Sequence, residues 1–485
     1  MPGAVEVSDD AAASVLKEQD DDLGRFHKAD EVVGLIRRIL PPENAASFED
    51  GRRDDQQTVN KLLVQVKDIL DAYLEQPYLL DPFMAQMLAR PLARLQNAVR
   101  RQNDSEPPSA ATDEALHRSA KLVYMLTKVR GHKAIMSYFP HEVADVVSTV
   151  AALQYYTRLG SVGGGGIAYD LTTGWELRYI LLLWLSLVCM IPFDLDKFRS
   201  GSNGPRIADS IVEITQHFLD SPSKERDVAA LTLGKVLQRR DLLDIHLPRF
   251  ISWSLESISP RAEPSAFLVV GILQTLCELY KSGTSSAILS FLPRIQTILS
   301  MGDHDTADSE CLRRLRTNSL VNKFRCKLAC RLGLTLLGPR SNGRGVVRKA
   351  LAGPDGDGDT QQNRILLDDD QVPEEIDAFI AQLLSCLEDR DTIVRYSAAK
   401  GLARICERLP ASFVDQVADA ITRLFEINVL RVGRDGMDLS AVSEHTWQGA
   451  CLGLAELGRR GQLSPDELED KLQWVRRVSG SEHSK

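Results

Sequence analysis

The residues of this chain that could do chemistry at close spacing complete no known catalytic or metal-binding pattern. Asp355, Asp357 and Asp359 alternate like the first ligands of a calcium loop. Thr360 stands where an EF-hand requires glycine, and Leu366 stands where its bidentate glutamate is needed. We therefore expect no calcium site there.

Nucleotide, zinc and nucleophile patterns fail in the same way. The glycine run 163–166 is not followed by Lys-Ser or Lys-Thr, as a phosphate-binding loop requires. His141 and Glu142 are not followed by a second histidine at the spacing of a zinc protease, and no Gly-x-Ser-x-Gly elbow occurs. Cys326 and Cys330 lack a second Cys/His pair at zinc-site spacing. The sequence predicts a non-catalytic protein without a metal or cofactor.

Composition excludes further classes of function. The formal net charge is −9 and the sequence pI is about 5.6, which argues against nucleic acid as a partner. The most apolar run, 179–191, is shorter than the roughly 20 residues of a bilayer span, so a buried helix without a membrane span is expected. The eight cysteines lie mostly in apolar stretches, which favours reduced core thiols in the cytosol.

The elements that would position any site are helices. Strict apolar alternation is rare, whereas apolar residues recur at helical spacing through most of the chain. The later candidates end at Pro, Gly or Asp turns. The expected helices include Met84–Val99, Leu242–Ile258, Ser286–Leu299, Leu312–Leu336, Thr392–Arg408, Ser443–Leu457 and Pro465–Val475.

These elements predict five segments. Residues 1–22 are acidic and expected to be disordered, residues 23–337 form N-terminal HEAT-like repeats, and residues 338–373 form a disordered acidic loop. Further HEAT repeats occupy 374–478, and 479–485 form a tail. A chain of 485 residues exceeds one compact core, and stacked repeats solve this because each repeat buries its apolar face on its neighbours.

The clearest repeat is Leu387–Pro410. Asp389 and Asp391 precede a helix whose apolar stripe begins at Val394, and a carboxylate there can cap the helix. Arg395 lies close to these carboxylates and suggests a ladder between repeats. The pattern predicts an all-α, HEAT/armadillo-type solenoid of stacked antiparallel helix pairs, a class that generally binds other proteins.

Four segments resemble the tubulin-folding cofactor D family, also called tubulin-specific chaperone D. They are KVRGHKAIMSYFPHEVADV at 128–146, WELRYILLLWLSLVCMIPFDL at 175–195, DRDTIVRYSAAKGLARICERLP at 389–410 and WQGACLGLAELGRRGQL at 447–463. They occur in the family's order. Family members are more than twice as long, so the resemblance implies a truncated form.

The resemblance implies a chaperone of the post-chaperonin tubulin folding pathway. Such a protein binds β-tubulin and works with cofactors E and C and an Arf-like small GTPase. Together they assemble and dismantle the αβ-tubulin dimer and stimulate GTP hydrolysis by tubulin. The expected location is cytoplasmic and microtubule-associated, and the expected binding surface is concave and partly acidic.

Polar residues inside the first two resembling segments are the candidate partner-binding residues. They are Arg130, His132, Lys133, His141, Glu142 and Asp194. Capping and hydrogen bonding between repeats are the alternative roles for each. Two alternative functions also stay open at this point: a HEAT scaffold or adaptor unrelated to tubulin, and an enzyme with hydrolase or GTPase activity of its own.

Overall fold

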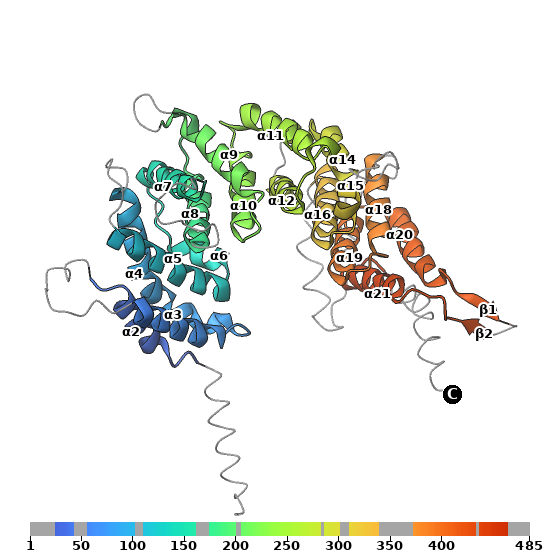
Figure 1. Cartoon of the computed structure of the whole chain (residues 1–485). Helices are drawn as coiled ribbons and strands as arrows, with labels where there is room; N and C mark the ends of the chain where they lie inside the picture. The colour runs from blue at the N-terminus through green and yellow to red at the C-terminus, as the bar shows by residue number, and fades with distance from the viewer. Residues whose placement is uncertain are drawn as a thin grey trace, which may run out of the picture. The chain divides into compact units, whose positions relative to one another are not determined.

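The computed structural model describes residues 25–42, 56–101, 110–161, 174–199, 205–282, 286–300, 310–338, 372–432 and 436–463. They fall into two compact units, Met1–Leu242 and Leu243–Lys485 (Figure 1). This division lies inside the region 23–337 that we expected to be one set of repeats. The predicted disordered N-terminus, the tail, the helix Pro465–Val475 and nearly all of the acidic loop lie outside the described residues.

The first unit consists of two packed rows of helices. One row contains α2 (Ala29–Ile39), α4 (Met84–Arg101), α7 (Ala144–Ser161) and α9 (Ile207–Phe218). The other contains α3 (Gln56–Asp71), α5 (Ala110–Arg130), α8 (Trp175–Val188) and α10 (Glu225–Val236). Short elements join them: η2 (Pro77–Phe83), α6 (His132–Ile135), η3 (Met136–Tyr138) and η4 (Leu195–Lys197).

The second unit repeats this plan. We call α12 (Ala266–Ser282), α16 (Ser319–Leu336), α19 (Thr392–Cys406) and α21 (Glu444–Arg459) the α12–α21 row, because each helix packs beside the next. Behind it lie α11 (Leu243–Ser257), α14 (Leu292–Leu299), α18 (Glu375–Cys386) and α20 (Ala411–Arg423), the α11–α20 row. The short elements are η5 (Pro260–Ala262), α13 (Ser286–Leu289), α15 (Glu310–Arg316), η7 (Leu424–Glu426), β1 (Leu430–Val432) and β2 (Gly436–Asp438). Paired helices in stacked rows confirm the predicted solenoid class.

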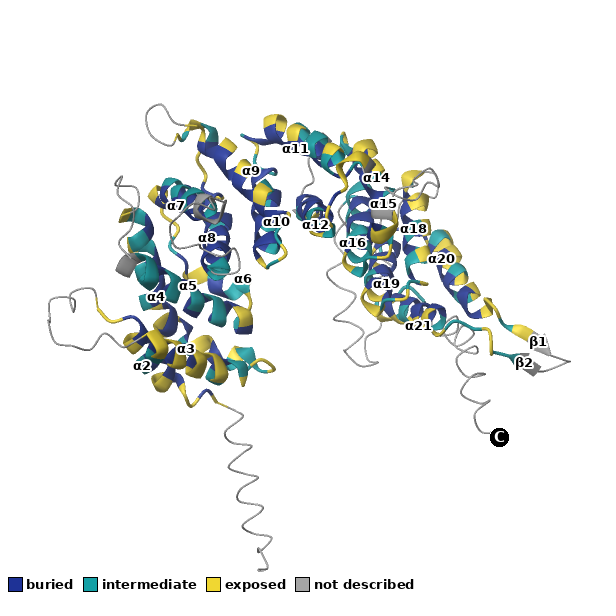
Figure 2. Ribbon diagram, in the orientation of Figure 1, coloured by how far each residue is buried: buried dark blue, intermediate teal, exposed yellow. Residues whose placement is uncertain are grey.

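The core of the first unit centres on α8, which is dark blue over most of its length in Figure 2. Every side chain from Ile180 to Leu185 is 0% exposed. The centre of the apolar run therefore lies inside the protein, as predicted, because α5, α7 and α10 pack around it, whereas Met190 near its end is exposed. No helix among the described residues combines the length and apolarity needed to cross a membrane.

Three local expectations were wrong. The predicted helix Leu312–Leu336 is two helices, because the Asn318 side chain accepts hydrogen bonds from the N–H groups of Leu320 and Val321 and starts α16 anew. The predicted helix Ser286–Leu299 divides into α13 and α14, and Pro293 lies in the first turn of α14, where its missing N–H costs nothing. An antiparallel hairpin, β1–β2, pairs Leu430 with Asp438 where no strand was expected.

Candidate partner-binding surface

The first motif segment begins at the corner between α5 and α6. Arg130, the last residue of α5, donates to both carboxylate oxygens of Asp81 in η2, at 2.5 and 2.9 Å. These hydrogen bonds lower the pKa of Asp81 below its usual value. Gly131 follows with φ +88°, a left-handed conformation that favours glycine. Arg130 therefore fixes the corner and remains only partly exposed, at 29%.

The predicted residues around this corner differ in how exposed they are and in the contacts they make. Lys133 is exposed on α6, and His132 is half-buried at its start. His141 is exposed, with Nδ1 3.4 Å from the Phe139 carbonyl. Glu142 forms an ion pair with Arg100 at 2.7 Å. Lys133 and His141 are thus the members of the set most available to a partner.

Arg100 connects the segment to the row behind it. Its Nε lies 2.7 Å from Oδ1 of Asp145, a carboxylate with no exposure, and its guanidinium also reaches Glu142. These acceptors raise the pKa of Arg100, the Asp145 hydrogen bond contributing most. The alternative structural role that we considered for Glu142 is thus supported.

The second motif segment packs against the first. Trp184 in α8 donates from Nε1 to the Pro140 carbonyl at 2.6 Å, and its ring centroid lies 6.5 Å from that of Phe139. Trp184 is completely buried. The structure therefore brings the two motif segments together, although they are far apart in sequence.

A clamp formed by Arg239 and Asp241 holds the turn after α8. Arg239 donates to the carbonyls of Cys189, Ile191 and Phe193 at 2.7 to 2.8 Å. It also pairs with Asp241 at 2.9 Å, and Asp241 accepts the Leu195 N–H at 2.8 Å. Burial alone would raise the pKa of Asp241, but the hydrogen bonds from Arg239 and the Leu195 N–H outweigh it and lower the pKa.

The clamp presents two apolar side chains to solvent. Met190 and Phe193 are 51% and 54% exposed. Asp194 is exposed beside them and pairs with Lys197 at 2.6 Å, a local contact between i and i+3. Lys133 and His141 on one segment and the clamped turn 189–195 on the other are therefore the candidate partner-binding elements of this unit.

The sequence did not reveal this clamp. Arg239 and Asp241 lie in the turn after α10, and the backbone groups they bind lie 46 to 50 residues upstream. The available signal was a charged Arg-Arg-Asp run at a helix end, which is common in solvated turns. The ion pairs of Arg130, Glu142 and Asp194 likewise go to residues outside the predicted set.

In the second unit, the repeat signature is built largely as predicted. Asp391 caps α19 by accepting the Ile393 N–H at 2.9 Å. Asp389 accepts from Asn322 of α16 at 3.1 Å. Arg395 is buried, yet it donates to the backbone carbonyls of Asp389 and Arg390 and to Gln448 of α21 rather than to carboxylates. A ladder therefore links three successive helices, with partners other than those expected.

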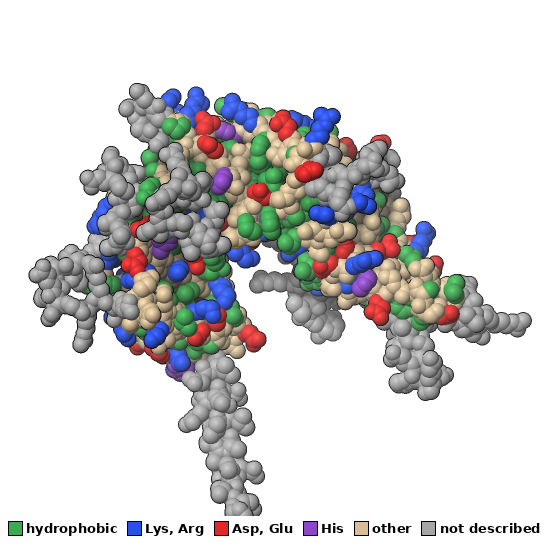
Figure 3. All heavy atoms as spheres, viewed as in Figure 1, with side chains coloured by type: hydrophobic (Ala, Val, Ile, Leu, Met, Phe, Trp, Pro, Cys, Tyr) green, Lys and Arg blue, Asp and Glu red, His purple; other side chains and the backbone are tan. Residues whose placement is uncertain are grey.

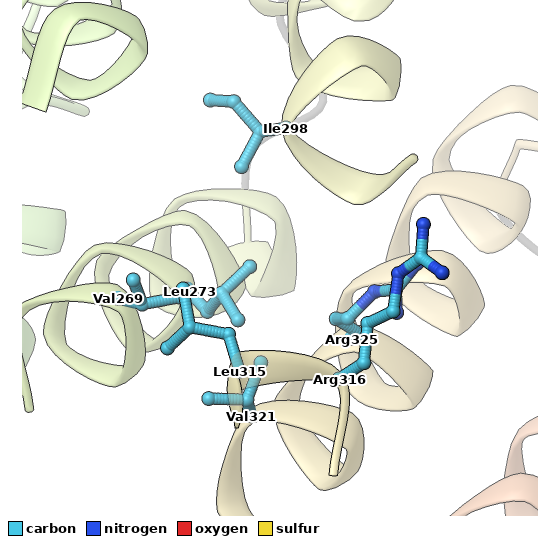
Figure 4. A pocket seen from close by; sticks show the side chains of 7 residues that line it. All are labelled: Val269, Leu273, Ile298, Leu315, Arg316, Val321 and Arg325. Atoms are coloured by element: carbon cyan, nitrogen blue, oxygen red, sulfur yellow. The ribbon is translucent and has the colours of Figure 1, made fainter. Parts of the chain in front are cut away.

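The second unit also holds a small cavity, shown in Figure 4. Its apolar lining comes from α12, α14, α15 and α16, and the side chains of Arg316 and Arg325 stand apart from that lining. A cavity of about 10 Å³ has room for roughly one water. We interpret it as a gap in packing. Among the described residues, no cluster of His, Cys, Asp and Glu is arranged to hold a metal ion.

The described cysteines are unpaired thiols, and most are buried. Burial raises the pKa of Cys189 to about 11 and that of Cys277 and Cys406 to about 12. A thiol with so high a pKa is protonated at neutral pH and is a poor nucleophile. These residues act as small core side chains.

Charged and apolar side chains are intermixed on the face of the first unit shown in Figure 3.

Two family models match the chain: "Tubulin-specific chaperone D-like, ARM repeat" over residues 70–258 and "Tubulin-specific chaperone D-like, ARM repeats" over residues 320–480. The chain belongs to the tubulin-specific chaperone D family. The first match includes both motif segments of the candidate surface, and the second includes the repeat at α19.

Two curated relatives agree with this assignment. Tubulin-folding cofactor D of Schizosaccharomyces pombe is 27% identical over 84% of this chain. Tubulin-specific chaperone D of Dictyostelium discoideum is 25% identical over 83% of it. The chain spans about one third of the length of these relatives, since 33% of each is covered.

Proposed function

We propose that the chain is a tubulin-binding chaperone module that acts without covalent chemistry. Membership of the tubulin-specific chaperone D family carries this proposal. The two-row helix architecture supports it, because stacked repeats offer long, rigid surfaces to protein partners. The partner is β-tubulin leaving the chaperonin, and the outcome is assembly or disassembly of the αβ-tubulin dimer.

The finer steps of the proposal involve other proteins. In a complex with cofactors E and C and an Arf-like small GTPase, the module contributes to stimulating GTP hydrolysis by tubulin, while the nucleotide itself stays on tubulin. The site of action is cytoplasmic and microtubule-associated. The unpaired thiols of the described core support a reducing compartment.

We propose that the tubulin contact includes Lys133, His141 and the turn 189–195. Lys133 and His141 are exposed polar side chains. The clamped turn adds the exposed side chain of Phe193, which could act as an apolar anchor. Interface hot spots combine such anchors with polar neighbours. The clamp fixes the turn beforehand, which reduces the entropy lost on binding.

Retention of native tubulin by the immobilised 485-residue chain tests this proposal. We expect β-tubulin capture to fall at least tenfold in the Lys133→Glu/Phe193→Ser variant. The Lys61→Glu/Val64→Ser variant is the control, since both residues are exposed on α3 of the same unit. Equal capture by both variants would remove this surface from the contact, and no capture by the folded wild-type chain would contradict tubulin binding by this module.

A further inference from the structure

Charge is distributed unevenly in this acidic chain. The sequences of α16 and α19 contain no Asp or Glu, although the whole chain has a formal net charge of −9. They contribute Lys323, Lys327, Lys400 and Arg404, which we call the four-base surface. The α12–α21 row is therefore basic at its centre, whereas we had expected a partly acidic surface.

The two helices that carry these bases lie side by side. Asn322 near the start of α16 bonds to Asp389 just before α19, and Arg408 just after α19 donates to the Leu334 and Gly338 carbonyls at the end of α16. The helices therefore run in parallel. At mid-height, a Cβ on Gly401 would lie 3.3 Å from Cβ of Cys330, so their backbones are close.

The bases face away from the row behind. The side of α19 toward the core carries Val394, Ala398, Leu402 and Ile405, all with no exposure. Lys400 and Arg404 lie on the opposite side with Tyr396, which is 44% exposed. On α16, Lys323 and Lys327 occur four residues apart and share one side of the helix.

None of these four cations forms a salt bridge with a described carboxylate, although Glu278 and Asp391 are close enough to act electrostatically on Lys327 and Lys323. The ion pairs nearest to the surface, such as those of Arg331 with Glu278 and Arg460 with Glu407, use other bases. Asp391, on which Lys323 acts electrostatically, caps α19. Burial lowers the pKa of Lys327, and the neighbouring charges of Lys323 and Arg331 lower it further, while Glu278 acts in the opposite direction. An external anion would relieve this repulsion.

Aromatic rings interleave with the bases. Lys400 lies 4.2 Å from the ring centroid of Tyr396, and Lys327 lies 4.9 Å from that of Phe324. Such cation–π contacts hold the ammonium groups in place and leave flat apolar surface between them. The surface can therefore contact both the carboxylates and the chain of a bound peptide.

We propose that the four-base surface binds an extended, carboxylate-rich peptide segment of a partner protein. Bases four residues apart on a helix are about 6 Å apart along its axis. Same-side side chains of an extended peptide repeat every two residues, about 6.7 Å. A peptide lying along α16 and α19 would direct alternate side chains to the two helices.

Binding of a fluorescent ten-residue poly-glutamate peptide to the full 485-residue chain tests the proposal. We expect saturable binding at low ionic strength that weakens as salt rises, because exposed charges are screened. The Lys400→Glu/Arg404→Glu variant should bind at least tenfold more weakly. The Arg249→Glu/Arg423→Glu variant makes the same charge change on exposed positions of α11 and α20 and should stay within about twofold of wild type.

Three results would overturn the proposal. The first is equal loss in both double variants whose thermal unfolding is unchanged, because net charge alone would then explain binding. The second is tighter binding of a single-stranded oligonucleotide to the same surface. The third is binding that appears only after Asp368, Asp369 and Asp370 are changed to Ser, because the chain's own acidic tract would then be the occupant. The test is independent of tubulin binding, so either proposal can fail alone.

Discussion

At the scale of single residues, a buried ion pair joins two helices of the first unit. Arg178 of α8 pairs with Glu225 of α10, and both side chains are less than 10% exposed. Glu225 also accepts from Ser221 and Ser223 at 3.0 and 2.7 Å. A buried pair of this kind stabilises little by itself, but removal of one partner leaves an uncompensated charge inside the protein.

Glu225→Ala should therefore destabilise the first unit by about 3–5 kcal/mol. Urea unfolding followed by circular dichroism measures the loss. Asp194→Ala removes a carboxylate from the exposed pair with Lys197 and should unfold close to wild type. A Glu225→Ala midpoint equal to that of Asp194→Ala would show that water or a neighbouring group compensates Arg178.

The clamp at Asp241 predicts a pH dependence. The pKa of Asp241 is lower in the folded state, so its stabilisation is present above the unfolded value of about 3.9 and is lost as pH falls through the folded pKa. Asp241→Asn should thus be less stable than wild type at pH 7, and the difference should shrink below about pH 4. Urea midpoints of both proteins across this range measure it; a difference that stays constant with pH would contradict a charged clamp.

At the scale of helices, close packing between neighbours depends on glycines, which have no side chain. A Cβ on Gly449 of α21 would lie 1.9 Å from the Leu387 carbonyl oxygen, a backbone atom that cannot rotate away. Gly401 has looser neighbours, with side-chain atoms of Leu383 and Cys330 at 3.2 to 3.3 Å. The fit of α21 against the turn after α18 therefore depends on one hydrogen atom in place of a methyl group.

Gly449→Ala should lower the thermal midpoint of the second unit, because α21 must move outward by more than an ångström to accept the methyl group. Gly34→Ala is the control, since nothing lies within 4 Å of a Cβ at that position of α2. It should raise stability by about 0.5–1 kcal/mol, the usual gain for Ala over Gly inside a helix. Differential scanning calorimetry compares the two; stabilisation by both would contradict the close approach at Leu387.

The sequence predicted much at this scale because helix existence follows from local periodicity. The 0% exposure of Leu181–Leu185 and the cap at Asp391 were both readable from residue type and spacing. The break at Asn318 was missed because apolar spacing continues across it, and the hairpin at Leu430 was missed because three-residue strands have too few positions to show alternation. The four-base surface was missed because it joins α16, which ends at Leu336, to α19, which begins at Thr392, and helical periodicity does not show which distant helices lie side by side.

At the scale of the whole molecule, the two units have separate cores. The buried pair Arg178–Glu225 and the close contact Gly449–Leu387 lie in different units. Interactions in stacked repeats reach mainly the nearest neighbours. A substitution that weakens one core should therefore lower the stability of that unit more than that of the other.

Calorimetry of the full chain should resolve the unfolding of the two units as two transitions. Glu225→Ala should shift one of them and Gly449→Ala the other, because each substitution weakens one core. The double variant should show both shifts with additive size, as expected for sites without shared partners. One transition that moves equally with either substitution would show that the units unfold as a single cooperative body.

The guanidinium of Arg239 has a further consequence for slow local motion. The turn 189–195 has a proline at 192, which carries no amide hydrogen, and the Leu195 amide is held by Asp241 rather than by a helix. Deuterium uptake at the Leu195 amide would then report how often the turn opens while both units stay folded. Exchange there that is faster than at the centre of α8, and faster still in Arg239→Lys, would give the free energy of opening the turn.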